Sequence, residues 1–290
     1  MILISTLVNG VLLGGFYALL GLGLSLTFGI MRTVNLAHGD LVVLASFLAL
    51  AIADYIGLSP IASSLLLVPF MFALGYALQS VVLNRRLKDG MMPAVIITFG
   101  LAFVIQNGLL ITFSADRAVL RQGAIETAGI TLMPGLTIGL LPVVTFAVVL
   151  LLLGGLHLLF TRTLIGRAFR ATSDDTQIAA LMGIDPKHIY ALAMGLACAI
   201  IAVTGILTGM RSNFSAFDGP IRLIFAFEVI IIGGMGSLYG VLAGGIILGL
   251  AQTIGGAINP TWFQLAGHVA TLAVLMVRPS GLFPATIDRN

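Results

Sequence analysis

The sequence predicts an all-α polytopic membrane protein, a bundle of about eight or nine transmembrane helices. Its 290 residues are 59% hydrophobic and only 9% charged, whereas soluble globular domains are roughly 25% charged. The mean hydropathy is +1.14. The 35 glycines are typical of bilayer helices that pack closely enough for their backbones to touch. A water-soluble fold is therefore excluded.

Five charge-free runs are long enough to cross a bilayer, which takes roughly 20 apolar residues. They are residues 1–31, 59–84, 91–115, 130–161 and 189–210. Residues 229–277 also lack Asp, Glu, Lys and Arg and need at least two passes, with a turn at Asn259-Pro260. The glycines at 233–236 divide the first of these passes again.

Residues 41–53 are apolar but too short to cross unless residues 35–40 enter the bilayer with them. This pattern predicts at least one broken helix. Because polar groups inside a bilayer are costly, we expect Asn35, His38 and Asp40 to line a solute path there. The alternative is an interfacial loop with solvated side chains. Glu228 is a fourth pathway candidate. Its side chain is expected to face the interior, to pair with Arg222 or to be solvated near the outer interface.

Lys and Arg favour cytoplasmic loops, which predicts the orientation. Alternating passes leave Arg117, Arg121, Arg211 and Arg222 outside, with the N-terminus outside and the C-terminus inside. This arrangement needs an odd number of passes, so residues 223–256 must cross twice. The ten basic residues placed inside, out of fourteen, are Arg32, Arg85, Arg86, Lys88, Arg162, Arg167, Arg170, Lys187, Arg278 and Arg289.

Two segments outside the bilayer remain. The outer loop, at about residues 114–133, has mixed charge and is expected to cap the bundle. The inner segment, at about 162–188, predicts a short helix in which Ser173 is the N-cap, Asp174 and Asp175 occupy the first turn and Gly183 follows the C-terminus. Ile178, Leu181 and Met182 would form one apolar face of that helix, suited to docking. An ordinary connecting helix is the alternative.

Glycines four residues apart permit two helices to cross closely. Such spacings join Gly10 to Gly14, Gly240 to Gly244 and Gly245 to Gly249. These glycines serve either packing within the chain or a contact between subunits.

No catalytic or metal site is expected. Neither Lys88 nor Lys187 follows the glycine loop of a nucleotide-binding site, and no HExxH or GxSxG motif occurs. Cys198 is the single cysteine, which excludes an intrachain disulfide and a paired-cysteine metal site. If ATP powers this protein, the hydrolysis must occur on a partner.

Residues 14–19 (GGFYAL) and 28–40 (FGIMRTVNLAHGD) closely resemble the opening of the branched-chain amino acid permeases of bacterial ATP-binding-cassette importers. Residues 166–171 (GRAFRA) and 179–184 (AALMGI) are similar to the cytoplasmic loop of that family. Residues 233–238 (GGMGSL) and 278–283 (RPSGLF) resemble its glycine-rich late helix and its terminus. The motifs occur in the family's order over nearly the whole chain.

The resemblance implies a single transmembrane permease domain, residues 1–290, in a bacterial inner membrane. It implies a second related permease, two subunits that bind ATP and Mg²⁺, and an extracytoplasmic solute-binding protein, with no cofactor on this chain. The coupling role falls on residues 173–183, flanked by Arg167 and Arg170. The expected substrates are branched-chain or related amino acids, although relatives take urea, amides or aromatic acids. An ATP-independent secondary transporter or channel for a small polar solute is the alternative.

Overall fold

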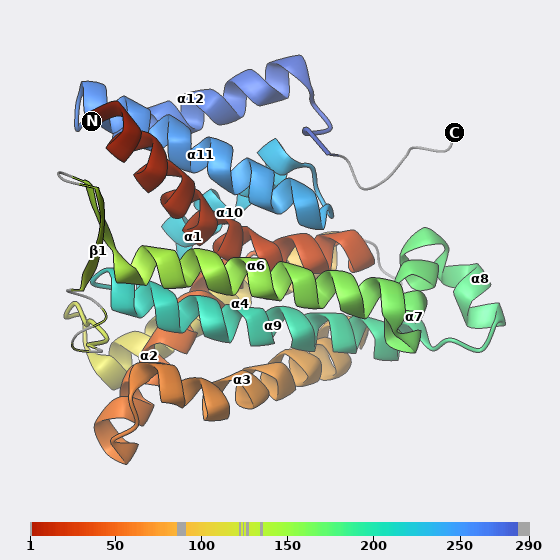
Figure 1. The fold of residues 1–290 in the computed structure, drawn as a ribbon. Helices are drawn as coiled ribbons and strands as arrows, with labels where there is room; N and C mark the ends of the chain where they lie inside the picture. Colours follow the sequence, from red (N-terminus) through yellow and green to blue (C-terminus); the bar gives the residue numbers. More distant parts are fainter. Residues whose placement is uncertain are drawn as a thin grey trace. The chain divides into compact units, whose positions relative to one another are not determined.

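Helices account for most of the chain. A computed structural model describes residues 2–85, 91–121, 123, 125, 128–133 and 136–283. Arg86, Lys88 and Arg289, on which part of the predicted orientation rests, lie outside these residues. The helices in Figure 1 are α1 Ile2–Met31, α2 His38–Ile56, α3 Pro60–Ala77, α4 Met91–Phe113, α6 Leu140–Arg162, α7 Leu164–Asp174, α8 Thr176–Leu181, α9 Pro186–Arg211, α10 Gly219–Gly233, α11 Leu238–Ile258 and α12 Trp262–Val277. A π-helical turn, η1 (Leu78–Val82), continues α3.

Within the described residues, seven helices are long and apolar enough to cross a membrane. They are α1, α2, α3 with η1, α4, α6, α9 and α11. The apolar helices α10 and α12 are shorter, at 15 and 16 residues. The prediction of an all-α polytopic membrane bundle is confirmed. The turn expected at Asn259-Pro260 also lies between α11 and α12.

One predicted span begins later than expected. The strands β1 (Gly129–Met133) and β2 (Leu136–Gly139) pair antiparallel, and α6 starts only at Leu140. Thr131 pairs with Thr137, and Ile130 with Ile138. These β-branched residues favour strands, and a charge-free run does not distinguish a strand from a helix.

The chain forms two compact units, each built from separate segments. The first comprises Met1–Ser25, Gly123–Leu153 and Ile224–Asn290, and the second comprises Leu26–Gln122 and Gly154–Leu223. Helices α1, α6 and α10 each contribute residues to both units.

Helix α9 is central to the second unit, where it packs against α2 and α3. Glycines allow these contacts, because a Cβ at Gly75 would lie 2.6 Å from the Cys198 sulfur and one at Gly205 would lie 2.7 Å from the Val42 carbonyl oxygen. The Ser46 hydroxyl donates a hydrogen bond to the Gly205 carbonyl, at 2.7 Å, across the same interface. The three helices therefore form a closely packed frame.

Contacts at the two ends of the second unit agree with the predicted sidedness. Ala118 and Phe214, both in loops predicted outside, exchange backbone hydrogen bonds of 2.9 Å. At the other end the Asn84 amide donates to the Lys187 carbonyl, at 3.0 Å, and both residues adjoin loops predicted inside.

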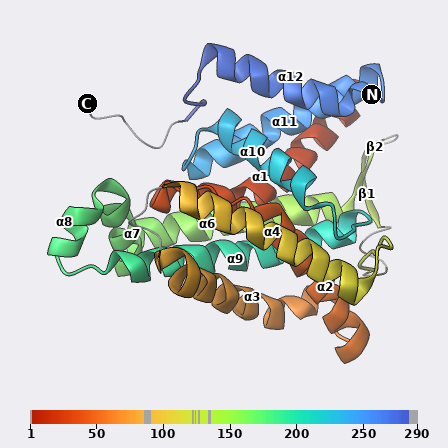
Figure 2. The same cartoon turned by 180° about the vertical axis from the view of Figure 1, so that it is seen from behind.

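In the first unit, α1 crosses α11 through glycines. A Cβ at Gly14 would lie 2.5 Å from the Ile246 Cα, and one at Gly249 would lie 2.4 Å from the Gly10 carbonyl oxygen. Helices α11 and α12 pack side by side as a hairpin (Figure 2). Helix α1 therefore contacts α11 at backbone-to-backbone distance.

The glycine-rich region forms two antiparallel helices, as the odd number of passes requires. Gly244 of α11 lies against Val229 of α10, and Gly240 lies against Gly233. The chain reverses between them with left-handed φ angles of 104° at Gly234 and 82° at Gly236, a conformation that favours glycine. The break predicted at 233–236 is confirmed.

The C-terminal motif caps the C-terminal end of α10. The backbone N–H groups of Leu282 and Phe283 donate to the carbonyls of Ile232 and Gly233, at 3.0 and 2.8 Å. The last carbonyls of a helix have no partner within it, and an unpaired group is costly in an apolar environment. Two of the motifs quoted above therefore meet in one capping interaction.

Replacing Gly249 with Ala is expected to lower the free energy of unfolding by about 1–3 kcal/mol, because the added methyl group overlaps the backbone of α1. Thermal unfolding of the purified protein in detergent measures the effect. Gly108→Ala is the matched control, since nothing lies within 4 Å of a Cβ there. It is expected to be neutral or to stabilise by up to about 1 kcal/mol. Equal destabilisation by both variants would contradict the crossing.

Candidate functional site

The polar motif between α1 and α2 is buried in the second unit. Helix α1 ends at Met31 and α2 begins at His38, so Asn35 lies in the connection and Asp40 in the first turn of α2. The exposed fractions are 6% for Asn35 and 2% each for His38 and Asp40. The alternative of a solvated loop is therefore wrong, and the irregular segment expected here lies at residues 32–37.

Asn35 supplies the backbone hydrogen bonds that the break in the helix removes. Its side-chain oxygen accepts from the Ala37 N–H at 3.0 Å, and its carbonyl accepts from the His38 N–H at 3.2 Å. The Leu36 N–H donates to the hydroxyl of Thr98 on α4, at 3.2 Å. We call residues 35–40 the buried turn. Its non-helical backbone is tolerated because protein groups pair with it.

Asp40 joins the buried turn to two further helices. Its carboxylate accepts a 2.8 Å hydrogen bond from the Gln106 side-chain amide of α4. A Cβ at Gly39 would lie 2.0 Å from the carbonyl oxygen of Gly219, the first residue of α10. The backbones of α2 and α10 therefore touch beside this carboxylate. A buried acid held by an amide is a group that can bind a polar or cationic part of a solute.

Glu228 lies in the first unit, and neither its pairing with Arg222 nor its solvation is correct. It is 6% exposed, and its carboxylate contacts the Nδ1 atom of His268 on α12. Arg222 pairs instead with Asp218, one helical turn away, at 3.5 Å. The separation of 40 residues between Glu228 and His268 gives no local signal of this pair in the sequence.

The inner segment folds as two helices, and Ser173 is not an N-cap. Thr163 is the N-cap of α7, and its hydroxyl accepts from the Gly166 N–H at 3.0 Å. The helix itself begins at Leu164 and continues through Ser173 to Asp174. Asp175 caps α8, accepting from the N–H groups of Gln177 and Ile178 at 2.8 and 2.9 Å. The capping signal at Thr163 could have been found in the sequence. Gly183, with φ +84°, does follow the C-cap of α8.

Three large apolar side chains of α8 and its C-cap are exposed in the described part of the chain. Ile178, Leu181 and Met182 are 60%, 87% and 78% exposed, whereas Ala179 on the other side is buried. Figure 1 shows α7 and α8 beyond the end of α9. We call these three exposed side chains the α8 face. Its position leaves it open to another protein.

Two contacts fasten α7 to the end of α1. The Ser173 hydroxyl donates to the Gly29 carbonyl at 2.7 Å, and the Arg32 guanidinium donates to the Ser173 carbonyl at 3.5 Å. Arg32 has a left-handed φ of 52°, which is unusual for a residue with a side chain. The α7–α8 segment therefore contacts the chain directly before Asn35.

The other residues predicted around the inner segment make local contacts or are exposed. The Arg170 guanidinium donates to the Phe160 carbonyl of α6 at 2.7 Å, while Arg167 and Asp174 are exposed. Thr176 of α8 and Tyr190 of α9 share a hydroxyl hydrogen bond of 3.1 Å. These contacts connect α7 and α8 to the frame of the second unit.

The glycines predicted at close helix crossings all lie at helix contacts within this chain, in the first unit. They are Gly10, Gly14, Gly240, Gly244, Gly245 and Gly249.

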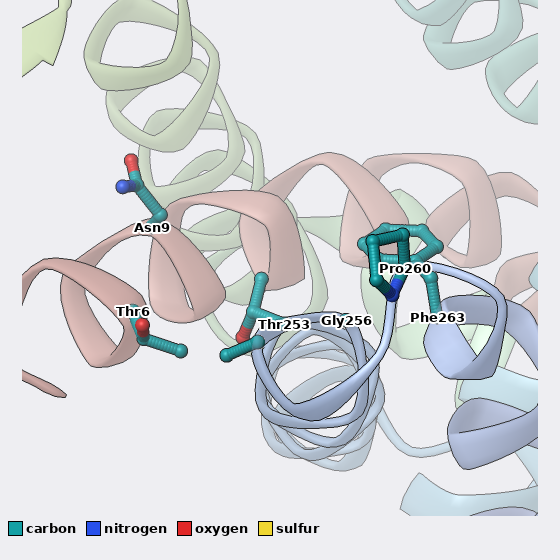
Figure 3. Close-up of a pocket in the computed structure, with 7 residues that line it drawn as sticks. Thr6, Asn9, Thr253, Gly256, Pro260 and Phe263 are labelled. Atoms are coloured by element: carbon teal, nitrogen blue, oxygen red, sulfur yellow. The ribbon is translucent and has the colours of Figure 1, made fainter. Parts of the chain in front are cut away.

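A separate pocket of about 430 Å³ lies in the first unit, between the start of α1 and the α11–α12 turn (Figure 3). Its lining comprises Thr6, Asn9, Thr253, Gly256, Ala257, Pro260 and Phe263. It contains none of the residues that the sequence predicts for a pathway. The described residues include no group of three or more His, Cys, Asp or Glu that could hold a metal ion.

Comparison with known families gives a match over most of the chain. Residues 6–277 match the family described as branched-chain amino acid transport system / permease component. The chain belongs to this family. The prediction of an importer permease of the ATP-binding-cassette class, of the LivH type, is thereby confirmed, and the alternative of a secondary transporter or channel is not favoured.

The names of individual relatives agree with this family assignment. The chain is 27% identical over 293 residues to the high-affinity branched-chain amino acid transport system permease protein BraD of Pseudomonas aeruginosa, covering 95% of this chain and 94% of that protein. It is 28% identical to LivH of Escherichia coli, covering 94% and 93% of the two chains. A second permease protein of the same transport class in Escherichia coli, LivM, is 24% identical, covering 93% of this chain and 68% of LivM. No solved structure matches.

Proposed function

We propose that this permease moves branched-chain or related amino acids inward across a bacterial inner membrane, driven by ATP hydrolysis on two partner subunits. A second permease related to LivM and an extracytoplasmic solute-binding protein would complete the importer. The names of the relatives support the substrate class. The occurrence of both LivH and LivM among the relatives supports pairing with a second permease.

The observation that carries the proposal is the α8 face. Three large apolar side chains, 60–87% exposed, project from a segment predicted to be cytoplasmic. Covering them with a partner removes apolar surface from water, which is favourable. The cytoplasmic ATP-binding subunits are the partners that this family's transport systems would place there.

The contacts of α7 suggest how motion reaches the solute path. A shift of α8 would be transmitted through Ser173 to the end of α1, because the two are hydrogen bonded. The buried turn follows directly in the sequence, so Asn35, His38 and Asp40 would move with it. In this mechanism the chain forms no covalent intermediate and moves no electrons. Its movement changes the side of the membrane from which solute can reach the polar groups of the buried turn.

Replacing Leu181 and Met182 together with Asp is expected to reduce copurification of the ATP-binding subunits by roughly tenfold or more, because the apolar contact is lost. The chain is expressed with its neighbouring genes and purified in mild detergent, and the subunits are quantified by mass spectrometry. Gln177→Asp with Ala180→Asp adds the same charge to α8 and is the matched control. If the folded Leu181 and Met182 variant copurifies the ATP-binding subunits undiminished, α8 is not their docking site.

Asp40→Ala is expected to lower ATP-driven uptake of radiolabelled leucine into proteoliposomes by about tenfold, because a charged hydrogen-bonding group is removed. Subunit assembly, followed by size-exclusion chromatography, should survive. Ser46→Ala is the control, since it removes another buried polar group of α2 outside the buried turn. Wild-type uptake by Asp40→Ala would remove this carboxylate from the pathway.

A further inference from the structure

A second pocket, of about 300 Å³, lies in the second unit between the end of α3–η1 and the start of α9. Arg85, Lys187 and His188 supply its basic groups, and Tyr76, Ser80 and Asn84 supply its neutral polar groups. None of these residues belongs to the buried turn or to the α8 face. We call it the basic pocket.

Hydrogen bonds of Asn84 hold together the two segments that carry Arg85 and Lys187. Asn84 is 8% exposed, and its side-chain amide donates to the Lys187 carbonyl at 3.0 Å. Its side-chain oxygen accepts from the buried Gln79 amide, also at 3.0 Å. Arg85 follows Asn84 directly, so the π-helical turn and the first turn of α9 are tied together where the charges lie. Single π-helical turns occur frequently at functional sites.

The polar groups of the pocket favour a singly charged anion. Arg85 and Lys187 are exposed cations, and Asp185 is the carboxylate in the lining. One Asp185 oxygen accepts from the Lys187 backbone N–H at 3.0 Å, where it caps α9. With neutral histidine these three side chains sum to one positive charge, which a phosphodiester matches better than a doubly charged free phosphate.

His188 can add a donor to the same space. Its Nδ1 atom lies 2.9 Å from the Tyr76 hydroxyl. When that hydroxyl donates to Nδ1, the neutral ring carries its proton on Nε2, which can then donate to an anion. The tyrosine therefore orients the histidine.

An apolar strip leads away from the basic pocket along α3 and η1. Its members are exposed residues at helical spacing on one face: Leu66, Phe70, Ala73, Ala77 and Val81. They lie on a segment long and apolar enough to span the bilayer. A ligand with an anionic head and a hydrocarbon chain fits both features, whereas a free anion would use only the first. Basic pockets between transmembrane helices on the cytoplasmic side are suited to anionic lipid head groups.

We propose that the basic pocket binds the phosphodiester head group of an anionic phospholipid, with an acyl chain of that lipid lying along the apolar strip. The site is independent of solute transport and rests on the membrane-spanning fold alone. Bound lipid would join α3 to α9 at the predicted cytoplasmic surface.

The test is native mass spectrometry of the full-length chain in detergent, titrated with phosphatidylglycerol or with phosphatidylcholine of the same acyl chains. Wild-type protein should prefer one phosphatidylglycerol over phosphatidylcholine. Arg85→Gln with Lys187→Gln should weaken phosphatidylglycerol binding by about 30-fold. Arg85→Lys with Lys187→Arg, which keeps both charges, should retain it.

Arg162→Gln with Arg278→Gln is the matched control, because it removes two other predicted cytoplasmic charges at helix ends. An equal loss in this control would show diffuse attraction and overturn the site. Equal binding of the two lipids would also overturn it. Displacement of phosphatidylglycerol by millimolar inorganic phosphate would assign the pocket to a free anion and reject the lipid. Circular dichroism of each variant establishes that loss of binding is not loss of fold.

Discussion

Backbone N–H and C=O groups within a bilayer must find partners in the protein, and this constraint explains where the chain departs from helix. Two such departures are the buried turn and the glycine break after α10. In the first, Asn35 and Thr98 supply the missing hydrogen bonds. In the second, Leu282 and Phe283 cap the carbonyls of Ile232 and Gly233. Both places coincide with the motifs that identify the family, so these motifs have a structural role apart from any contact with solute.

The buried turn also links the two functions proposed for the second unit, which are docking of an ATP-binding subunit and contact with the solute. Gly29 and Arg32 receive the contacts of Ser173, and the polar side chains of Asn35 and Asp40 follow within eleven residues of Gly29. A short, well-packed connection transmits displacement better than a long loop, because few of its dihedral angles are free to absorb it. The φ angle of 52° at Arg32 shows that the surrounding structure holds this connection in an uncommon conformation.

Much of this fold could be predicted from hydropathy, because a bilayer requires long apolar helices. The glycine break and the turn at Asn259-Pro260 followed from local chemistry. Other features depended on distant partners. Hydropathy did not distinguish the strands at 129–133 and 136–139 from a helix, and nothing near Glu228 indicated His268. The acids that follow Ser173 favour an N-cap there, whereas Thr163 caps a longer helix and Asp175 caps the next. The basic pocket joins residues about 100 apart, so spacing could not reveal it.

In the proposed mechanism, Ser173 and Arg32 transmit the motion of α8 to the buried turn. The direct measurement compares ATP hydrolysis with leucine uptake in the reconstituted transporter carrying Arg32→Gly and Ser173→Ala, where glycine tolerates the φ of 52°. Thr161→Ala with Arg162→Gly, at the exposed end of α6, is the control. We expect ATP hydrolysis to continue while the amount of leucine moved per ATP falls severalfold in the Arg32 and Ser173 variant alone. An unchanged ratio of uptake to hydrolysis would contradict it.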